Sequence, residues 1–258
     1  MRDLRDAKLL VMTAGGLNPQ VMINALARHY PRLAVIQENY ESKGTLLRRR
    51  ARRLGWPTAL GQLATMMLSR LGKRMTARRS DEILRDYRLS GDVNPAIPVT
   101  HVASLNDERA HDAIRAFAPD RVFTISCRIL AKTTLAAIPC PIVNFHAGIN
   151  PLYRGQMGGY WARVEGDEAN FGATLHLVDA GTDTGATLAE VRTRPSRLDT
   201  ISTYPLLLTA AGVETTLQVV DDVLKGTAKP FAPEGRSMLR FPPPIWTYLH
   251  VGLTRRIW

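Results

Sequence analysis

The chain has 258 residues, of which 45% are hydrophobic and 22% are charged, and this composition suits one large α/β domain. Two cysteines, Cys127 and Cys140, are too few for a zinc site, so we expect two reduced thiols. No apolar run approaches the roughly 18 residues of a spanning helix, and the N-terminus lacks the features of a secretory signal. We therefore expect a cytoplasmic protein.

The first part of the chain predicts a βαβ unit. An apolar run at 8–12 indicates a buried strand, the segment TAGGLNPQ at 13–20 indicates a tight turn, 21–30 has helical periodicity, and 32–38 is a second strand. A strand followed by a helix and a second strand is typical of a parallel sheet with right-handed crossovers.

Residues 41–80 interrupt this pattern as a basic helical insertion. The net charge of the chain is +11, and the eleven basic residues between Lys43 and Arg79, without one acidic residue, account for all of it. Apolar residues recur there at the spacing of one helix face; they are Leu60, Leu63, Ala64, Met67, Leu68 and Leu71. A shorter helix before them is expected to end at Gly55 and Pro57.

The α/β rhythm resumes after the insertion. The predicted elements are a helix at 104–117 with Asn106 as its cap, a strand at 120–126, a helix at 133–138, strands at 141–147, 172–179 and 186–193, and a helix at 203–226 that ends at Gly226. The tail, residues 228–258, is rich in proline and aromatic residues, and we expect it to pack on the body or on a partner. We predict a single domain, 1–258, with a Rossmann-like, mostly parallel twisted sheet flanked by helices.

An amide and an imidazole side chain stand together at the end of the strand 141–147. Asn144 and His146 are two residues apart, so their side chains lie on the same face of the strand. Ligands of open parallel sheets bind beyond the carboxyl ends of the strands. The pair is therefore a candidate for chemistry, and Asp183 lies in an Asp- and Gly-rich loop further along the chain.

The order and spacing of four segments resemble the formyltransferase family. These segments are SCRIL, NFHAGINPLYRG, GYWARVEGD and GATLHLVDAGTDTG, within residues 120–193. The family pattern is Asn-x-His, a proline-containing loop and then an Asp-Gly-type loop nearly forty residues later. Relatives usually read His-Pro-Ser-Leu-Leu-Pro where this chain reads His146 to Pro151 as HAGINP, so the first and last positions are kept and the loop between them differs.

The resemblance implies transfer of a formyl group from 10-formyltetrahydrofolate to a primary amine, without a metal. Asn144 and His146 would stabilise the oxyanion of a tetrahedral intermediate, and Asp183 would support the imidazolium of His146 and relay protons. The implied folate cleft is formed by two short loops, whose residues are Cys127, Arg128, Ile129 and Leu130, and Val178, Asp179, Ala180 and Gly181. For Ile129 and Leu130, plain core packing is an equally good interpretation.

The acceptor amine is the part of the reaction that the sequence defines least. We expect a small and anionic sugar-amine or nucleotide-amine, bound by the turn after the first strand and by the loop after His146; the candidate residues are Gly15, Gly16, Asn18, Tyr153, Arg154 and Gly155. Only 32 residues follow Gly226, too few for the tRNA-binding domain of the methionyl-tRNA enzymes, so nucleic acid is not expected as a partner.

Two other functions remain open at this point. In a formyltetrahydrofolate hydrolase, water would replace the amine at the same three residues. In a binding protein on the same scaffold, the basic segment 43–79 would contact nucleic acid or a membrane surface. The aromatic residues Trp246, Tyr248 and Trp258 would either stack on a ligand or complete the core. The sequence does not specify an oligomeric state.

Overall fold

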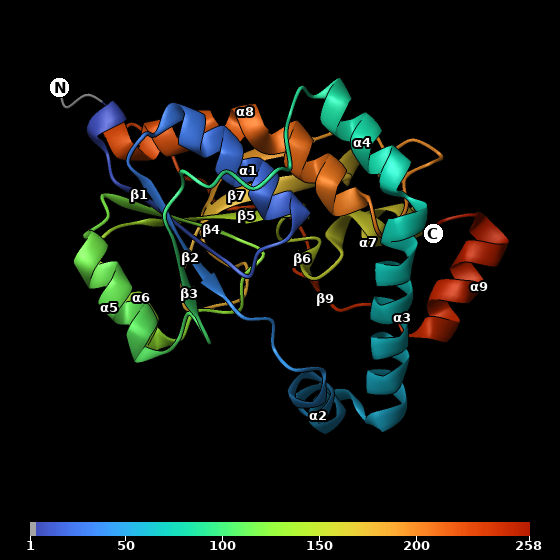
Figure 1. The fold of residues 1–258 in the computed structure, drawn as a ribbon. Helices are drawn as coiled ribbons and strands as arrows, with labels where there is room; N and C mark the ends of the chain where they lie inside the picture. The colour runs from blue at the N-terminus through green and yellow to red at the C-terminus, as the bar shows by residue number, and fades with distance from the viewer. Residues whose placement is uncertain (1–3) are drawn as a thin grey trace.

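The computed structural model describes residues 4–258 and every side chain among them except that of Lys73. Within this range a seven-stranded sheet has the order β3-β2-β1-β4-β5-β7-β8 (Figure 1). Its strands are β1 (Leu9–Thr13), β2 (Leu33–Glu38), β3 (Val99–Val102), β4 (Arg121–Ile125), β5 (Ile142–His146), β7 (Gly172–Leu177) and β8 (Thr187–Arg192). The predicted Rossmann-like fold with a mostly parallel sheet is confirmed.

Strands β1 to β5 are parallel, β7 runs antiparallel to them, and β8, which pairs antiparallel with β7, runs in their direction again. The strand β3 was not predicted, because VTHV is short and half exposed and carries little apolar signal. The strand β7 lies next to β5 and runs in the opposite direction. As a result, the side chains of β7 face those of β5 directly across the sheet.

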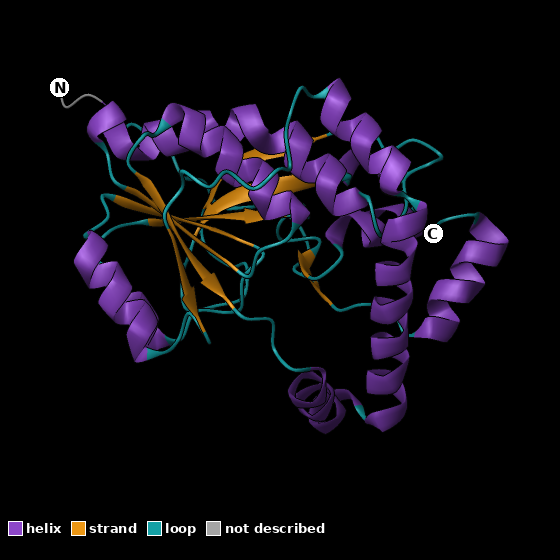
Figure 2. Ribbon diagram, in the orientation of Figure 1, coloured by secondary structure: helices purple, strands orange, loops and turns teal. Residues whose placement is uncertain are grey.

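Helices cover both faces of the sheet (Figures 1 and 2). One face carries α1 (Leu17–His29) and α8 (Tyr204–Lys225), which lie side by side, and the other carries α5 (Glu108–Phe117) and α6 (Lys132–Ala137). Alternate residues of β1 belong to different apolar clusters: Leu9 and Val11 to the cluster under α1 and α8, and Leu10 and Met12 to the cluster under α5. This alternation is expected of a strand that is buried on both faces.

Helix ends follow local backbone chemistry. As predicted, α8 ends before Gly226, which has a φ of 72° that favours glycine. The predicted cap of α5 was wrong by one residue, since Asp107 accepts the N–H of Ala110, while Asn106 bonds instead to the backbone of residues 129 and 131.

The insertion consists of three helices between β2 and β3. They are α2 (Lys43–Leu54), α3 (Trp56–Met75) and α4 (Ala77–Asp86), and α2 and the first part of α3 extend away from the sheet (Figure 1). Neither α4 nor α7 (Gly158–Glu165) was predicted, and single helical turns lie at η1 (Leu4–Asp6) and η2 (Glu168–Asn170).

The tail returns to the body in two steps. First β9 (Leu239–Arg240) pairs with β6 (Arg154–Gly155), and then α9 (Ile245–Arg255) begins directly after Pro244 and lies beside α3. Tyr248 and Trp258 complete the core through edge contacts, with ring centroids 5.8 Å apart, whereas Trp246 is half exposed against α3. Within residues 4–258, no helix has the length and apolar character needed to cross a membrane.

Candidate active site

Asn144 is held from both sides by neighbouring strands. It pairs in register with Thr124 of β4 and with His176 of β7. Its Oδ1 accepts the Thr124 hydroxyl at 2.8 Å, and its Nδ2 lies 2.9 Å from Nε2 of His176. An amide nitrogen carries two hydrogens, so one N–H of Asn144 remains for a ligand at the end of the strand.

His176 is a member of this cluster that the sequence analysis missed. Its Nδ1 lies 2.8 Å from the carbonyl oxygen of Leu177, which can only accept, so Nδ1 carries a proton. In the neutral ring, Nε2 then accepts from Asn144, and the same nitrogen lies 3.5 Å from Oδ1 of Asp183. The signal in the sequence was its position opposite Asn144, which is evident only once β7 is known to be the antiparallel neighbour of β5.

His146 is buried and its ring is oriented by the loop that follows it. Its Nε2 lies 2.8 Å from the backbone oxygen of Tyr153, and because that oxygen only accepts, Nε2 carries a proton. Its Nδ1 is 3.6 Å from Oδ2 of Asp183, which is beyond hydrogen-bond distance. Nδ1 therefore faces the carboxylate without being fully engaged by it.

The loop between His146 and Tyr153 requires glycine at position 148. A Cβ on Gly148 would lie 2.4 Å from the Tyr153 oxygen and 2.8 Å from Nε2 of His146. Thr174 anchors the same loop, since its hydroxyl donates to the Gly148 oxygen and accepts the N–H of Asn150. The departure of HAGINP from the usual family loop is thus accommodated by close packing around His146. The peptide bond before Pro151 is cis.

Asp183 reaches the two histidines from the loop between β7 and β8. Its backbone has a φ of 51°, and its Oδ2 accepts the N–H of Gly155 at 2.9 Å. Burial acts to raise its pKa, but the neighbouring His146 and His176 and the N–H of Gly155 outweigh burial and lower the pKa to about 2. Asp183 is therefore a carboxylate at neutral pH.

Three residues expected to bind the acceptor hold this site together. The Tyr153 oxygen orients His146, Gly155 bonds to Asp183, and Nε of Arg154 donates to the Thr182 oxygen at 2.9 Å. The Tyr153 hydroxyl donates instead to Asp167, and burial followed by the nearby carboxylates raises its pKa above the usual range. Tyr153, Arg154 and Gly155 therefore contact the groups around His146 and Asp183, and their expected role in acceptor binding stays a prediction.

The first expected folate loop lies at the end of β4. Arg128 is tied to the buried Glu38, with its N–H and its Nε each 2.7 Å from a carboxylate oxygen. Leu130 belongs to the core, whereas Ile129 is 64% exposed. Burial, then Glu38 and Asp183, raises the pKa of Cys127 to about 12. The loop therefore exposes Ile129, while Arg128 turns back to pair with Glu38 and Cys127 is partly covered.

The second expected folate loop joins β7 to the Asp183 segment. Val178 extends the sheet by donating its N–H to the Ile142 oxygen at 2.9 Å. Asp179 accepts the N–H of Gly181 and the hydroxyl of Thr184, so its carboxylate closes the turn. Ala180 and Gly181 are exposed at the tip of the loop. Among the described residues, no group of three histidine, cysteine or acidic side chains could hold a metal ion.

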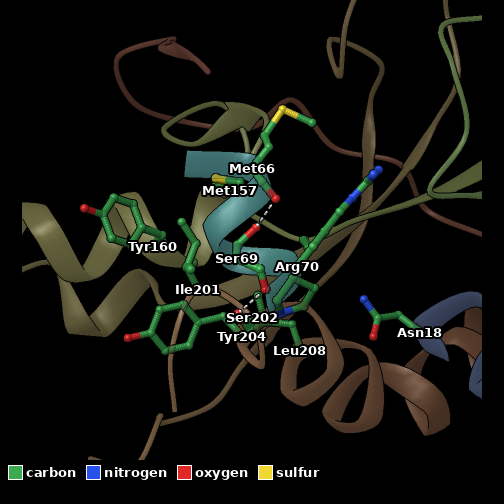
Figure 3. Close-up of a pocket in the computed structure, with 13 residues that line it drawn as sticks. Asn18, Met66, Ser69, Arg70, Met157, Tyr160, Ile201, Ser202, Tyr204 and Leu208 are labelled. Carbon is green, nitrogen blue, oxygen red and sulfur yellow. Dashed lines mark hydrogen bonds between the residues drawn. The ribbon is translucent and has the colours of Figure 1, made fainter. Parts of the chain in front are cut away.

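A cavity of about 230 Å³ is lined in part by Ala147, the residue that follows His146. It is lined mainly by apolar side chains from α7 and α8 and by Ala147, and Asn18 reaches it from α1 (Figure 3). Met66, Ser69 and Arg70 line it from α3, where Ser202 donates to the Ser69 oxygen at 2.8 Å. The basic insertion therefore forms one wall of the cavity.

The turn before α1 is the other segment that the sequence analysis expects at the acceptor. Gly15 and Gly16 have φ values of 79° and 108°, which favour glycine, and Gly16 is the cap residue of α1. A Cβ on Gly15 would collide with the Gln37 side chain. Of the three residues expected here, Asn18 lines the cavity, and the two glycines shape the turn that positions it.

Several solved structures have a similar fold. A sugar N-formyltransferase from Shewanella has a TM-score of 0.54 at 12% identity, over 91% of this chain and 76% of that one. Glycinamide ribonucleotide transformylase 1 from Symbiobacterium toebii has a TM-score of 0.57 at 18% identity, over 90% of this chain and 96% of that one. HypX from Aquifex aeolicus, in complex with tetrahydrofolic acid, has a TM-score of 0.54 at 14% identity, over 91% of this chain and 29% of that one. These likenesses establish the fold.

Sequence comparison identifies the family. The methionyl-tRNA formyltransferase of Desulfotalea psychrophila is 32% identical over 134 residues, 52% of this chain and 41% of that protein. That of Bacteroides thetaiotaomicron is 28% identical over 153 residues, 58% of this chain and 47% of that protein. The chain thus spans less than half the length of these curated relatives. A model of one family, described as formyl transferase, matches residues 8–220, and the chain belongs to the formyl transferase family.

Proposed function

We propose that this protein transfers a formyl group from 10-formyltetrahydrofolate to the primary amine of a small molecule of the sugar-amine or nucleotide-amine type. The observation that carries the proposal is the convergence of Asn144, His146, His176 and Asp183 at the end of β5. Family membership and the fold support the reaction class.

The reaction needs donors for a developing oxyanion. When the amine nitrogen attacks the formyl carbon, an N–C bond forms and the carbonyl oxygen becomes negative. The remaining N–H of Asn144 is available for this oxygen, as is a proton on Nδ1 of His146, since that nitrogen is not engaged at hydrogen-bond distance. One such donor contributes about 3–4 kcal/mol to transition-state stabilisation.

When the tetrahedral intermediate collapses, a proton must move from the amine to the folate nitrogen. The bond between the formyl carbon and the folate nitrogen breaks, that nitrogen gains a proton, and the attacking amine loses one. Asp183 is ionised, and its carboxylate lies 3.6 Å from Nδ1 of His146, so the two groups are placed to pass a proton between the amine and the folate nitrogen. Such proton transfer contributes about 10²–10⁴-fold in rate.

The folate is expected between the loops 127–130 and 178–181. The exposed side chain of Ile129 and the exposed tip at Ala180 and Gly181 suit a flat ring with hydrogen-bonding edges. HypX, a structure of the same fold, is described in complex with tetrahydrofolic acid, which supports a folate as the donor.

The acceptor is expected in the cavity beside Ala147. Its apolar walls suit a ring, and Arg70, which forms no hydrogen bond or ion pair with another residue in the described part of the chain, suits an anionic group. The Shewanella sugar N-formyltransferase supports a sugar-amine.

Methionyl-tRNA is a second candidate acceptor. The curated relatives that match this chain are methionyl-tRNA formyltransferases, so the expectation that excluded nucleic acid is not supported. The basic insertion, with eleven bases and no acid, would suit a polyanion of this kind.

Calorimetric titration with 5-formyltetrahydrofolate, a stable relative of the donor, tests the folate site. We expect saturable binding in wild-type protein and weaker binding in Ile129→Asp, with Val93→Asp as the control because Val93 is also an exposed apolar residue. Absence of binding at millimolar ligand would contradict a folate donor. Turnover of 10-formyltetrahydrofolate without any amine would instead indicate a hydrolase.

A further inference from the structure

The helix α3 presents its apolar stripe outward. Leu71 is 62% exposed and Met75 is 89% exposed, whereas Gln62 and Thr65 on the opposite side are 3% and 0% exposed. A surface helix of a globular protein normally does the reverse and buries the apolar stripe. The periodicity at 60–71 therefore predicts an apolar face correctly, but the protein body covers the small and polar side of the helix instead.

The last helix continues this apolar surface. Trp246, Leu249 and Leu253 of α9 recur at the spacing of one helix face, and all three are exposed. The Trp246 ring packs on Gly61, where a Cβ would lie 2.6 Å from the ring, so α9 and α3 lie side by side (Figure 1). We define the α3–α9 face as the exposed apolar residues of both helices: Trp56, Leu60, Met67, Leu68, Leu71, Met75, Trp246, Leu249 and Leu253.

The two chain segments that form this face are basic and contain no acid, and Glu41 is an acidic residue that lies close to Met67 and Arg70. Residues 43–79 and 235–258 carry eleven and four basic residues and no aspartate or glutamate. Four exposed arginines form no hydrogen bond or ion pair with another residue in 4–258; they are Arg48, Arg52, Arg70 and Arg74. By contrast, Arg79 is paired with the buried Asp199. Arg70 and Arg74 lie on α3 itself, and Arg48 and Arg52 lie on the adjoining α2. Unpaired guanidinium groups on helices that also expose tryptophan, leucine and methionine are typical of a surface that meets both phosphate and hydrocarbon.

We propose that the α3–α9 face docks on the surface of a lipid bilayer that contains anionic lipids. The apolar side chains enter the boundary between headgroups and acyl chains, and the arginines of α2 and α3 pair with lipid phosphates. This inference does not depend on the proposed function. Arg70 and Met66 also line the cavity, so a docked α3 would join the membrane surface to the acceptor side of the site.

Two other occupants fit the surface less well. Nucleic acid would engage the arginines but would gain little from Leu71, Met75 and Leu253, because base edges and phosphates are polar. A second copy of the chain would bring the same predominantly basic surface against itself across a two-fold axis, so that mostly like charges would face each other.

Vesicle co-sedimentation of the full chain tests the proposal. We expect wild-type protein to bind phosphatidylcholine vesicles that contain phosphatidylglycerol, to bind pure phosphatidylcholine much more weakly, and to release with added salt. The double variant Leu71→Glu/Met75→Glu should lose at least about tenfold in affinity, since two apolar side chains no longer enter the boundary. Val93→Glu, on an exposed residue outside the face, is the matched control and should bind like wild type.

The charge contribution is tested separately. Arg48→Glu/Arg52→Glu should also lose at least about tenfold in vesicle affinity, because each basic residue near an anionic surface adds to the attraction. Arg28→Glu/Arg109→Glu, on exposed and unpaired arginines of α1 and α5, is the control with the same charge change. Circular dichroism checks that every variant is folded.

Three results would overturn the proposal. The first is failure of folded wild-type protein to bind anionic vesicles. The second is vesicle binding that the Leu71→Glu/Met75→Glu variant retains in full. The third is a wild-type dimer in sedimentation velocity that this variant dissociates, which would assign the face to a second copy.

Discussion

Replacement of Asp183 by asparagine should destabilise the protein in a way that depends on pH. The pKa of Asp183 falls from 3.8 to about 2 on folding, because His146, His176 and the Gly155 N–H outweigh burial. A difference of about 1.8 pKa units, at 1.36 kcal/mol per unit, corresponds to about 2 kcal/mol of stability from the ionised carboxylate. Asparagine has nearly the same shape and can still accept the Gly155 N–H, so it removes mainly the charge.

The sign of the effect follows from the lowered pKa. The stabilisation is fully present well above 3.8, the value in the unfolded chain, and it is lost as pH falls toward about 2. The difference in the free energy of unfolding between wild type and Asp183→Asn should therefore be about 2 kcal/mol at pH 7. It should be about half of that near pH 3.

Urea unfolding followed by tryptophan fluorescence measures this difference, since the chain has four tryptophans. Subtracting the two proteins at each pH removes the contributions of the other carboxylates. A variant as stable as wild type at pH 7 would refute the reasoning. So would a difference that is equally large at pH 7 and pH 3.

Three further predictions concern groups around the site. Gly148→Ala should lower kcat at least about tenfold and cost about 1–3 kcal/mol in stability, because its Cβ would meet the Tyr153 oxygen at 2.4 Å. Enzyme kinetics and urea unfolding measure the two effects, and Gly44→Ala is the control because nothing lies within 4 Å of a Cβ there. Equal kcat for the two variants would be inconsistent with close packing at Gly148. Glu38→Ala should cost about 3–5 kcal/mol in urea unfolding, since it removes the carboxylate that pairs with Arg128 and leaves the N–H groups of Leu105 and Arg128 without their acceptor. A cost below about 1 kcal/mol would contradict this. Cys127 should resist iodoacetamide at pH 8 in the folded protein, because desolvation and the nearby Glu38 and Asp183 raise its pKa to about 12. Rapid labelling read by mass spectrometry would contradict the raised pKa.

The sequence predicted most of the parallel sheet because buried strands have a strong apolar signal. Residues 8–12 and 141–147 became β1 and β5, and the two-residue spacing of Asn144 and His146 placed both side chains at one end of a strand. Family resemblance added Asp183, whose carboxylate does approach His146 in the structure. Its role in catalysis stays a proposal.

Long-range pairing was beyond the reach of sequence patterns. His176 contacts Asn144 only because β7 pairs with β5 in an antiparallel register, and Arg128 meets Glu38 across 90 residues of chain. Both contacts depend on strand order, which local periodicity does not encode. The hydrogen bond from Arg154 to the Thr182 oxygen was likewise not foreseen, and the role expected for Arg154 at the acceptor stays a prediction.

Helices outside the sheet were predicted less well. In the tail, Pro242, Pro243 and Pro244 suggested an irregular segment, yet α9 begins directly after them because Pro244 suits the position before a helix. Periodicity identified the apolar face of α3 but could not say which face would be covered. Which face is buried depends on packing with other elements such as α9, where the ring of Trp246 packs directly on Gly61.

The central claim is that His146 and its neighbours catalyse formyl transfer to an amine. The most direct test is the conversion of 10-formyltetrahydrofolate to tetrahydrofolate, followed by chromatography, with an amino-sugar nucleotide, glycinamide ribonucleotide or methionyl-tRNA as acceptor. We predict amine-dependent turnover by wild-type protein with one of these acceptors. We also predict a loss of at least about 10²-fold in His146→Ala, with binding of 5-formyltetrahydrofolate retained. Turnover by folded His146→Ala at the wild-type rate would contradict the account.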